Sequence, residues 1–140
     1  MTVRKFRQQD KEALVSLWRA VFPDDPPHNE PSRMIEEKLK VDDLIFVAEE
    51  DGNIVGGCMA GYDGHRGWLY AVAVLPACRG RGTGSHLVEF AMEHLKQLGC
   101  IKVNLQLRAG NRAAAFYRAI GFSVEDRISM GKPIGGGDIR

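Results

Sequence analysis

The sequence lacks the features that would place the chain in a membrane, in a disulfide-bonded scaffold or on a polyanion. No apolar run approaches the roughly 18 residues of a membrane-spanning helix, and the N-terminus has no apolar stretch typical of a secretory signal. Three cysteines, 20 and 22 residues apart, fit neither a disulfide framework nor a paired metal motif. The net charge is only +1, which argues against nucleic acid as a partner. We therefore expect a reduced, cytoplasmic protein without a membrane or nucleic-acid partner.

What is present is the composition of one globular domain. With 140 residues, 44% of them hydrophobic, the chain can bury about two-thirds of its unfolded surface. Apolar periodicity and turn residues predict a single α/β domain over residues 1–132, with helices packed on a mixed sheet, and a flexible tail over 133–140. In chain order we expect a strand over 3–6, helices over 11–22 and 32–40, strands over 43–49, 54–62 and 68–76, a helix over 85–98, a strand over 101–107, a helix over 111–120 and a strand over 123–130.

Local signals indicate where several of these elements begin and end. Asp10 is expected to cap the first helix, and four prolines between residues 23 and 31 predict a loop before the second. The turn at residues 51–53 predicts a hairpin between two strands. Gly99 is a typical residue for ending the helix that precedes it.

The most informative segment is the glycine-rich turn Arg79-Gly80-Arg81-Gly82-Thr83-Gly84, which lies between an apolar strand and a helix. The first amides of a helix have no partners within it, and its dipole favours negative charge there. Glycines let the backbone approach phosphate oxygens, and arginines add charge-assisted donors. The segment predicts a phosphate site, the alternative being a tight turn with surface arginines. Two nucleotide fingerprints fail, because GxGxxG breaks at Ser85 and GxxxxGK[ST] is absent.

Two stretches resemble the GNAT family of N-acetyltransferases. The first, VAVLPACRGRGTG over residues 72–84, is similar to the family's acetyl-CoA signature Arg/Gln-x-x-Gly-x-Gly/Ala, matched by Arg79, Gly82 and Gly84. The second, LRAGNRAAAFYRAIGF over residues 107–122, resembles a later block of the family. The resemblance implies a GNAT fold and transfer of acetyl from acetyl-CoA, as co-substrate, to a primary amine: a protein N-terminus, a lysine or a small-molecule amine.

The resemblance also implies which residues contact acetyl-CoA. Backbone groups of residues 72–74 would pair with the pantetheine arm, and the amides of residues 80–84 would surround the pyrophosphate. A bulge would splay this strand from residues 101–107 and provide an N–H group for the developing oxyanion. Asn111 is expected either to contact CoA or to cap its helix. The expected contacts are Val72, Ala73, Val74, Arg79, Gly80, Arg81, Gly82, Thr83, Gly84 and Asn111.

Tyr117 is the expected general acid, because it lies four residues before Gly121, as the acid of the family does. The alternative is a tyrosine that only packs on the buried face of its helix. A base is not evident, since the similar ribosomal-protein N-terminal acetyltransferases carry a glutamate where this chain has Gln106. His65 is carried as a hypothesis for the base or the substrate side. Glu49, Glu50, Asp63, a water relay and binding of an already neutral amine are the alternatives.

The acidic loop between the first two helices suggests a cationic acceptor. Asp24, Asp25, His28 and Glu30 would attract a protonated amine, or would serve only solubility. The missing base keeps open a second function, a CoA-binding sensor without turnover. The histidine spacings give no metal-ligand set, so no metal is expected. The oligomeric state is left open, with a homodimer among the options.

Overall fold

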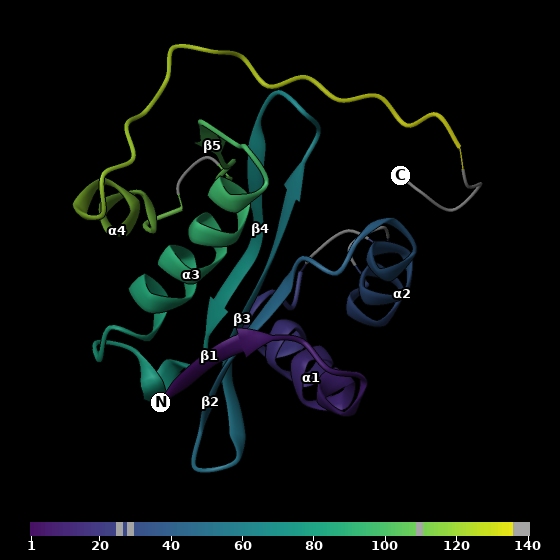
Figure 1. Cartoon of the computed structure of the whole chain (residues 1–140), viewed down its shortest axis with the longest axis vertical. Coiled ribbons are helices and arrows are strands. Elements are labelled where there is room, and N and C mark those ends of the chain that lie inside the picture. Colours follow the sequence, from purple (N-terminus) through teal and green to yellow (C-terminus); the bar gives the residue numbers. More distant parts are fainter. Residues whose placement is uncertain (25–26, 28–29, 109–110, 136–140) are drawn as a thin grey trace.

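The computed structural model describes residues 1–24, 27, 30–108 and 111–135. Its centre is a five-stranded sheet in the order β1-β2-β3-β4-β5, with helices on both faces (Figure 1). The strands are β1 (Thr2–Lys5), β2 (Ile45–Glu50), β3 (Asn53–Tyr62), β4 (Gly67–Val74) and β5 (Val103–Asn104). The helices are α1 (Lys11–Val21), α2 (Pro31–Val41), α3 (Thr83–Gln97) and α4 (Ala114–Ala119), with short 3-10 turns η1 (Gln8–Asp10) and η3 (Pro76–Cys78).

The sheet is mixed, as the sequence predicts. Strands β1 to β4 pair antiparallel with their neighbours, and β5 lies parallel to β4. The expected hairpin is confirmed: Asp51 and Gly52 both adopt positive φ, +52° and +80°, between β2 and β3. Within the described ranges, no helix combines the length and the apolar content that crossing a bilayer requires.

Each face of the sheet is covered by its own hydrophobic cluster, because side chains alternate along a strand. In β2, Ile45 and Val47 pack toward α1 and α2, whereas Phe46 and Ala48 pack toward α3. The first cluster includes Leu14, Leu17, Trp18, Ile35 and Met59. The second includes Cys58, Leu87, Val88, Ala91, Leu95 and Tyr117. The two layers of helices thereby enclose β3 and β4 between them.

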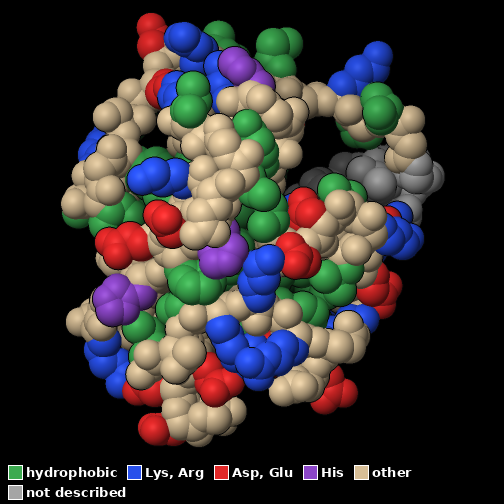
Figure 2. Space-filling view, viewed as in Figure 1, with side chains coloured by type: hydrophobic (Ala, Val, Ile, Leu, Met, Phe, Trp, Pro, Cys, Tyr) green, Lys and Arg blue, Asp and Glu red, His purple; other side chains and the backbone are tan. Residues whose placement is uncertain are grey.

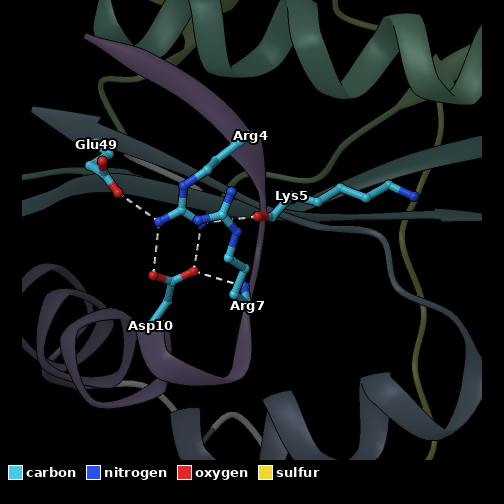
Figure 3. Close-up of polar contacts among 5 residues, drawn as sticks. All are labelled: Arg4, Lys5, Arg7, Asp10 and Glu49. Carbon is cyan, nitrogen blue, oxygen red and sulfur yellow. Dashed lines mark hydrogen bonds and ion pairs between the residues drawn. The ribbon is translucent and has the colours of Figure 1, made fainter. Parts of the chain in front are cut away.

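Asp10 occupies the expected N-cap position of α1, but its side chain makes no capping hydrogen bond to that helix. Its carboxylate is turned toward Arg4, whose guanidinium donates to it at 2.8 and 3.0 Å, and it also accepts the Arg7 backbone N–H at 2.7 Å (Figure 3). Arg4 donates further to Glu49 of β2 at 2.7 Å. Arg4 holds the pKa of the buried Asp10 below its ordinary value. The resulting stabilisation is therefore present at neutral pH and is lost as the pH falls through the lowered pKa.

The expected strand over residues 123–130 is also wrong. Val124, Ile128 and Met130 are 73%, 91% and 91% exposed. Figure 1 draws this segment as a coil that does not join the sheet, while the space-filling view in Figure 2 shows a gap between the later part of the described C-terminal segment and the body of the molecule. Side-chain hydrogen bonds connect it to β5 and the residue before it, with Glu125 accepting from Lys102 and Asn104. Among the described residues, this segment has no strand edge to pair with, because β5 ends at Asn104 instead of residue 107. Most of the expected tail, residues 136–140, lies outside the described residues.

Three helices have boundaries that differ from expectation in ways that bear on the site. Pro31 opens α2 instead of belonging to the loop, since the first helical position needs no N–H donor. The Glu30 carboxylate caps the same helix by accepting the Arg33 amide at 3.0 Å. Helix α3 begins at Thr83, two residues earlier than expected, and α4 is shortened to residues 114–119. The early start of α3 moves its first amides into the glycine-rich turn.

Candidate active site

Strand β4 carries a bulge halfway along its length, as expected. Gly57 pairs with Ala73 and Met59 with Tyr70, so Cys58 alone faces two residues of β4. One of them, Ala71, has a φ of +51°, a left-handed conformation that costs an L-residue about 1–2 kcal/mol. A bulge of this kind bends the strand and re-aims the groups beside it.

Beyond its start, β4 separates from β5. The two strands pair only at Gly67 with Val103 and at Trp68 with Asn104. Past these pairs, residues 105–108 form the opposite wall of a cavity of about 1290 Å³. The cavity exceeds the roughly 300–1,000 Å³ of a pocket for one small ligand. It therefore has room for a nucleotide-sized co-substrate together with an acceptor.

The start of α3 closes one end of this cavity. Gly82 precedes the helix with a φ of +80° and no side chain caps the first turn, so its amides are left for a ligand. Nothing lies within 4 Å of where a Cβ on Gly80 or Gly82 would stand. Unpaired helix amides beside open space fit a phosphate group. Of the expected contacts, those that line the cavity are Val72, Ala73, Val74, Arg79, Gly80, Gly82, Thr83, Gly84 and Asn111.

The two arginines of the turn face different ways. Arg79 lines the cavity, and its Nε donates to the Val74 carbonyl at 3.1 Å. Arg81 stands outside the lining, where its guanidinium bonds Glu50 at 3.1 Å. The expected role of Arg81 therefore rests on its backbone amide, and of the two guanidinium groups only that of Arg79 borders the cavity.

Tyr117 borders the cavity from α4 and is 7% exposed. Its ring packs edge-on against Phe116 and Phe122, with centroids 4.9 and 5.6 Å apart. Burial, with a smaller contribution from Cys58, raises the pKa of Tyr117 to about 12. The phenol is therefore protonated at neutral pH and can donate a hydrogen bond. Because Cys58 stands opposite the bulge, Tyr117 also lies close to the middle of β4.

Asn111 lies in the cavity wall but does not cap α4, whose N-cap residue is Ala113. It borders the cavity, and its Oδ1 accepts the Ala113 amide at 2.7 Å, just before α4 begins. The side-chain oxygen thus supports the turn into the helix, while the residue faces the space where a ligand would lie.

The structure brings none of the proposed bases into the cavity. Glu49 bonds Arg4, and Glu50 bonds Arg81. Asp63 accepts the amides of residues 65 and 66, which lowers its pKa. His65 lies exposed in the loop between β3 and β4, outside the lining. Gln106 does line the cavity, and its amide donates to Ser129 at 2.7 Å.

The far end of the cavity is built from α1, α2 and the first half of β4. Asp24 is the one carboxylate among the described lining residues. The Glu30 carboxylate forms an ion pair with Arg19 at 2.7 Å. Asp25 and His28 lie outside the described residues. The sequence analysis missed Lys38, which pairs with Asp42 at 2.9 Å, and Tyr70, which is half exposed. The signal that could have identified Tyr70 is its hydroxyl group, a polar group within the otherwise apolar strand expected over residues 68–76.

Comparison with known proteins connects this geometry to a family. Residues 11–122 match the sequence model of the acetyltransferase (GNAT) family. An acetyltransferase of Pectobacterium atrosepticum is 42% identical over 136 residues, 94% of either chain. One of Yersinia pseudotuberculosis is 40% identical over 136 residues, again 94% of either chain.

Solved structures show the same fold. Glucosamine-6-phosphate N-acetyltransferase from Arabidopsis thaliana superposes with a TM-score of 0.71 at 29% identity, covering 96% of this chain and 98% of that one. An aminoglycoside N-acetyltransferase in complex with CoA superposes with a TM-score of 0.78 at 20% identity, covering 94% of this chain and 93% of that one. On the family match and the curated relatives, the chain belongs to the acetyltransferase (GNAT) family and is an acetyl-CoA-dependent N-acetyltransferase.

Proposed function

We propose that the chain transfers acetyl to a primary amine that binds at the Asp24 end of the cavity and is cationic in solution. One observation carries this proposal: a single cavity runs from the start of α3, past the bulge in β4, to Asp24. A carboxylate at one end of a cleft concentrates positive charge there. The acceptor class is thus a protein N-terminus, a lysine side chain or a small amine such as an amino sugar.

The other end of the cavity would hold acetyl-CoA. The amides of residues 80–84 surround the pyrophosphate, and the Arg79 side chain supplies positive charge beside it. Residues 72–74 offer a strand edge that β5 does not pair, so an extended pantetheine arm can hydrogen-bond along it. With these contacts the thioester would lie next to the bulge at Ala71 and Val72.

At the bulge, the amine nitrogen attacks the thioester carbonyl, so a C–N bond forms and the C–S bond breaks. A backbone N–H of the bulge stabilises the developing oxyanion. Tyr117 donates a hydrogen bond to the sulfur as it gains negative charge. The pKa of Tyr117, about 12, lies well above the roughly 8.5 of a thiol. Tyr117 therefore stabilises the leaving thiolate mainly as a donor, and the proton lost by the amine ends on the sulfur.

Activation of the amine does not need a carboxylate base in this arrangement. None of the proposed bases borders the cavity, so the amine reacts in its neutral form. Asp24 attracts the protonated amine from solution. The amine then loses this proton before it attacks the thioester. Most of the rate enhancement then comes from holding amine and thioester together.

The test is an acceptor screen with the purified chain and acetyl-CoA. The panel contains a peptide with a free N-terminus, an Nα-blocked lysine, an amino sugar and a polyamine, each paired with its fully acetylated form as a control. Release of CoA thiol and acetylation of the amine by mass spectrometry are measured together. We expect stoichiometric thiol and product with at least one cationic amine. Thiol release with none of them, under conditions where acetyl-CoA binds, would contradict the proposal.

A further inference from the structure

The bulge in β4 depends on a backbone conformation that the strand does not favour by itself. Apart from Ala71, the only described non-glycine residue with positive φ is Asp51, which lies in a hairpin turn where such angles are ordinary. Ala71 is instead in the middle of a strand between two layers of helices. A residue of this kind persists only where its surroundings hold it.

One side chain holds Ala71 directly. The indole Nε1 of Trp18 donates to the Ala71 carbonyl at 2.7 Å. Trp18 is 1% exposed, and an indole has one donor and no acceptor. The Ala71 carbonyl belongs to a residue that lacks a paired partner in β3. The hydrogen bond thus satisfies a buried donor and an oxygen that the sheet leaves out.

Trp18 also connects this contact to the acceptor end. It lies on α1, and the residues that follow it, Val21 and Phe22, line the same cavity, as does Ala71. Leu14, on the same helix, packs where a Cβ on Gly57 would stand, so α1 presses on β3 beside the bulge. The orientation of β4 at the bulge is therefore fixed by the helix that shapes the acceptor end.

We infer that Trp18 is a positioning residue for acetyl transfer: its indole N–H keeps the bulge in the conformation that directs β4 backbone groups at the thioester. The inference rests on the proposed function for the step it affects. It assigns Trp18 no contact with either substrate. Losing the hydrogen bond should therefore slow turnover without weakening the binding of acetyl-CoA.

The test replaces Trp18 by Phe, which keeps an aromatic ring and removes the N–H group. Val15→Ala, on the same helix and outside the cavity, serves as a control that loses core packing but keeps the hydrogen bond. For Trp18→Phe, measured well below its melting temperature, we expect kcat to fall about 10- to 100-fold. The acetyl-CoA Kd should stay within about twofold, because the α3 end is untouched.

Amide hydrogen exchange over residues 69–74 gives a readout that does not depend on the acceptor. We expect faster exchange there in Trp18→Phe than in Val15→Ala at equal global stability. If the wild type acetylates no amine of the panel, the proposed function fails. The exchange data still decide whether the hydrogen bond from Trp18 to Ala71 holds the bulge. Unchanged exchange, or a fall in kcat no larger than that of Val15→Ala, would overturn the inference.

A second substitution separates the effect of the Trp18–Ala71 hydrogen bond on the bulge from a general loss of packing. Glycine adopts positive φ without strain, so Ala71→Gly in the Trp18→Phe background removes the need to hold the residue. We expect the double variant to recover part of the lost kcat. A double variant as slow as Trp18→Phe would show that the hydrogen bond does not act through the bulge.

Discussion

The two ends of the cavity are built from different parts of the chain. At the start of α3 the lining includes backbone amides, glycines and one strand edge, together with the Arg79 side chain. At the other end it is made of side chains from distant elements, among them Asp24, Lys38 and Tyr70. A phosphate recognised by backbone needs a fixed local sequence, whereas a pocket of side chains can change one residue at a time. The first end should therefore be sensitive to any Cβ, and the second should tolerate substitution and alter only the choice of acceptor.

Tyr117, which lies between the two ends, should show the largest effect. Tyr117→Phe removes the hydroxyl donor and keeps the ring packing, so kcat should fall about 100-fold or more while the acetyl-CoA Kd is unchanged. Steady-state kinetics and calorimetric titration measure the two quantities. Tyr62→Phe, a partly buried tyrosine outside the cavity, is the matched control. If Tyr117→Phe retains the kcat of that control, Tyr117 only packs.

The backbone end is tested by Gly82→Val. A β-branched residue at a φ of +80° is strained. The strain energy is equivalent to roughly 5- to 30-fold weaker acetyl-CoA binding. Any clash with phosphate adds to this loss. Gly131→Val is the control, because Gly131 lies in open space without positive φ. Titration of both variants with acetyl-CoA measures the effect. Wild-type affinity in a folded Gly82→Val would remove the turn from the binding site.

The side-chain end is tested by Asp24→Asn. The loss of one carboxylate should raise the acceptor KM about 3- to 10-fold and leave the acetyl-CoA Kd unchanged. Added salt should raise the wild-type KM in the same direction, and the variant should respond less. Glu12→Gln removes the same charge from α1 outside the cavity. Equal acceptor KM for the two variants at low salt would exclude Asp24 from the acceptor site.

The smallest effect concerns pH. With an α-amine acceptor of pKa about 7.7–8.0, kcat/KM should rise with pH until the amine is neutral and then level off. Tyr117 must be protonated to donate, and its pKa of about 12 keeps it so across this range. No falling limb is therefore expected below about pH 10. A descending limb between pH 8 and 9 in a folded enzyme would indicate a more acidic donor than Tyr117.

The same contrast explains what the sequence could predict. The glycine-rich turn from Arg79 to Gly84 was predictable from local sequence, whereas the bulge was expected only from the resemblance to the GNAT family, because a tertiary contact from Trp18 holds Ala71 in its conformation. Helix α3 was placed two residues late because glycine at its start obscured the boundary. The strand over 123–130 was wrong because alternation says nothing about whether a partner edge exists. Lys38 and Trp18 were not assigned to the site, because only the packing of α1 on β4 and of α2 on α1 brings Trp18 to the Ala71 carbonyl and Lys38 to the cavity.

The continuity of the cavity has a consequence for the order of events during turnover. The cavity of about 1290 Å³ would hold both proposed substrates at the same time. Among the described lining residues, the one thiol is Cys78, which adjoins the glycine-rich turn at the end opposite the acceptor. Within this described lining, no thiol therefore lies near the acceptor end to carry the acetyl group as a covalent acetyl-enzyme intermediate. Initial-velocity plots should give intersecting lines, the pattern of a ternary complex, and acetyl-CoA alone should leave the chain without added mass.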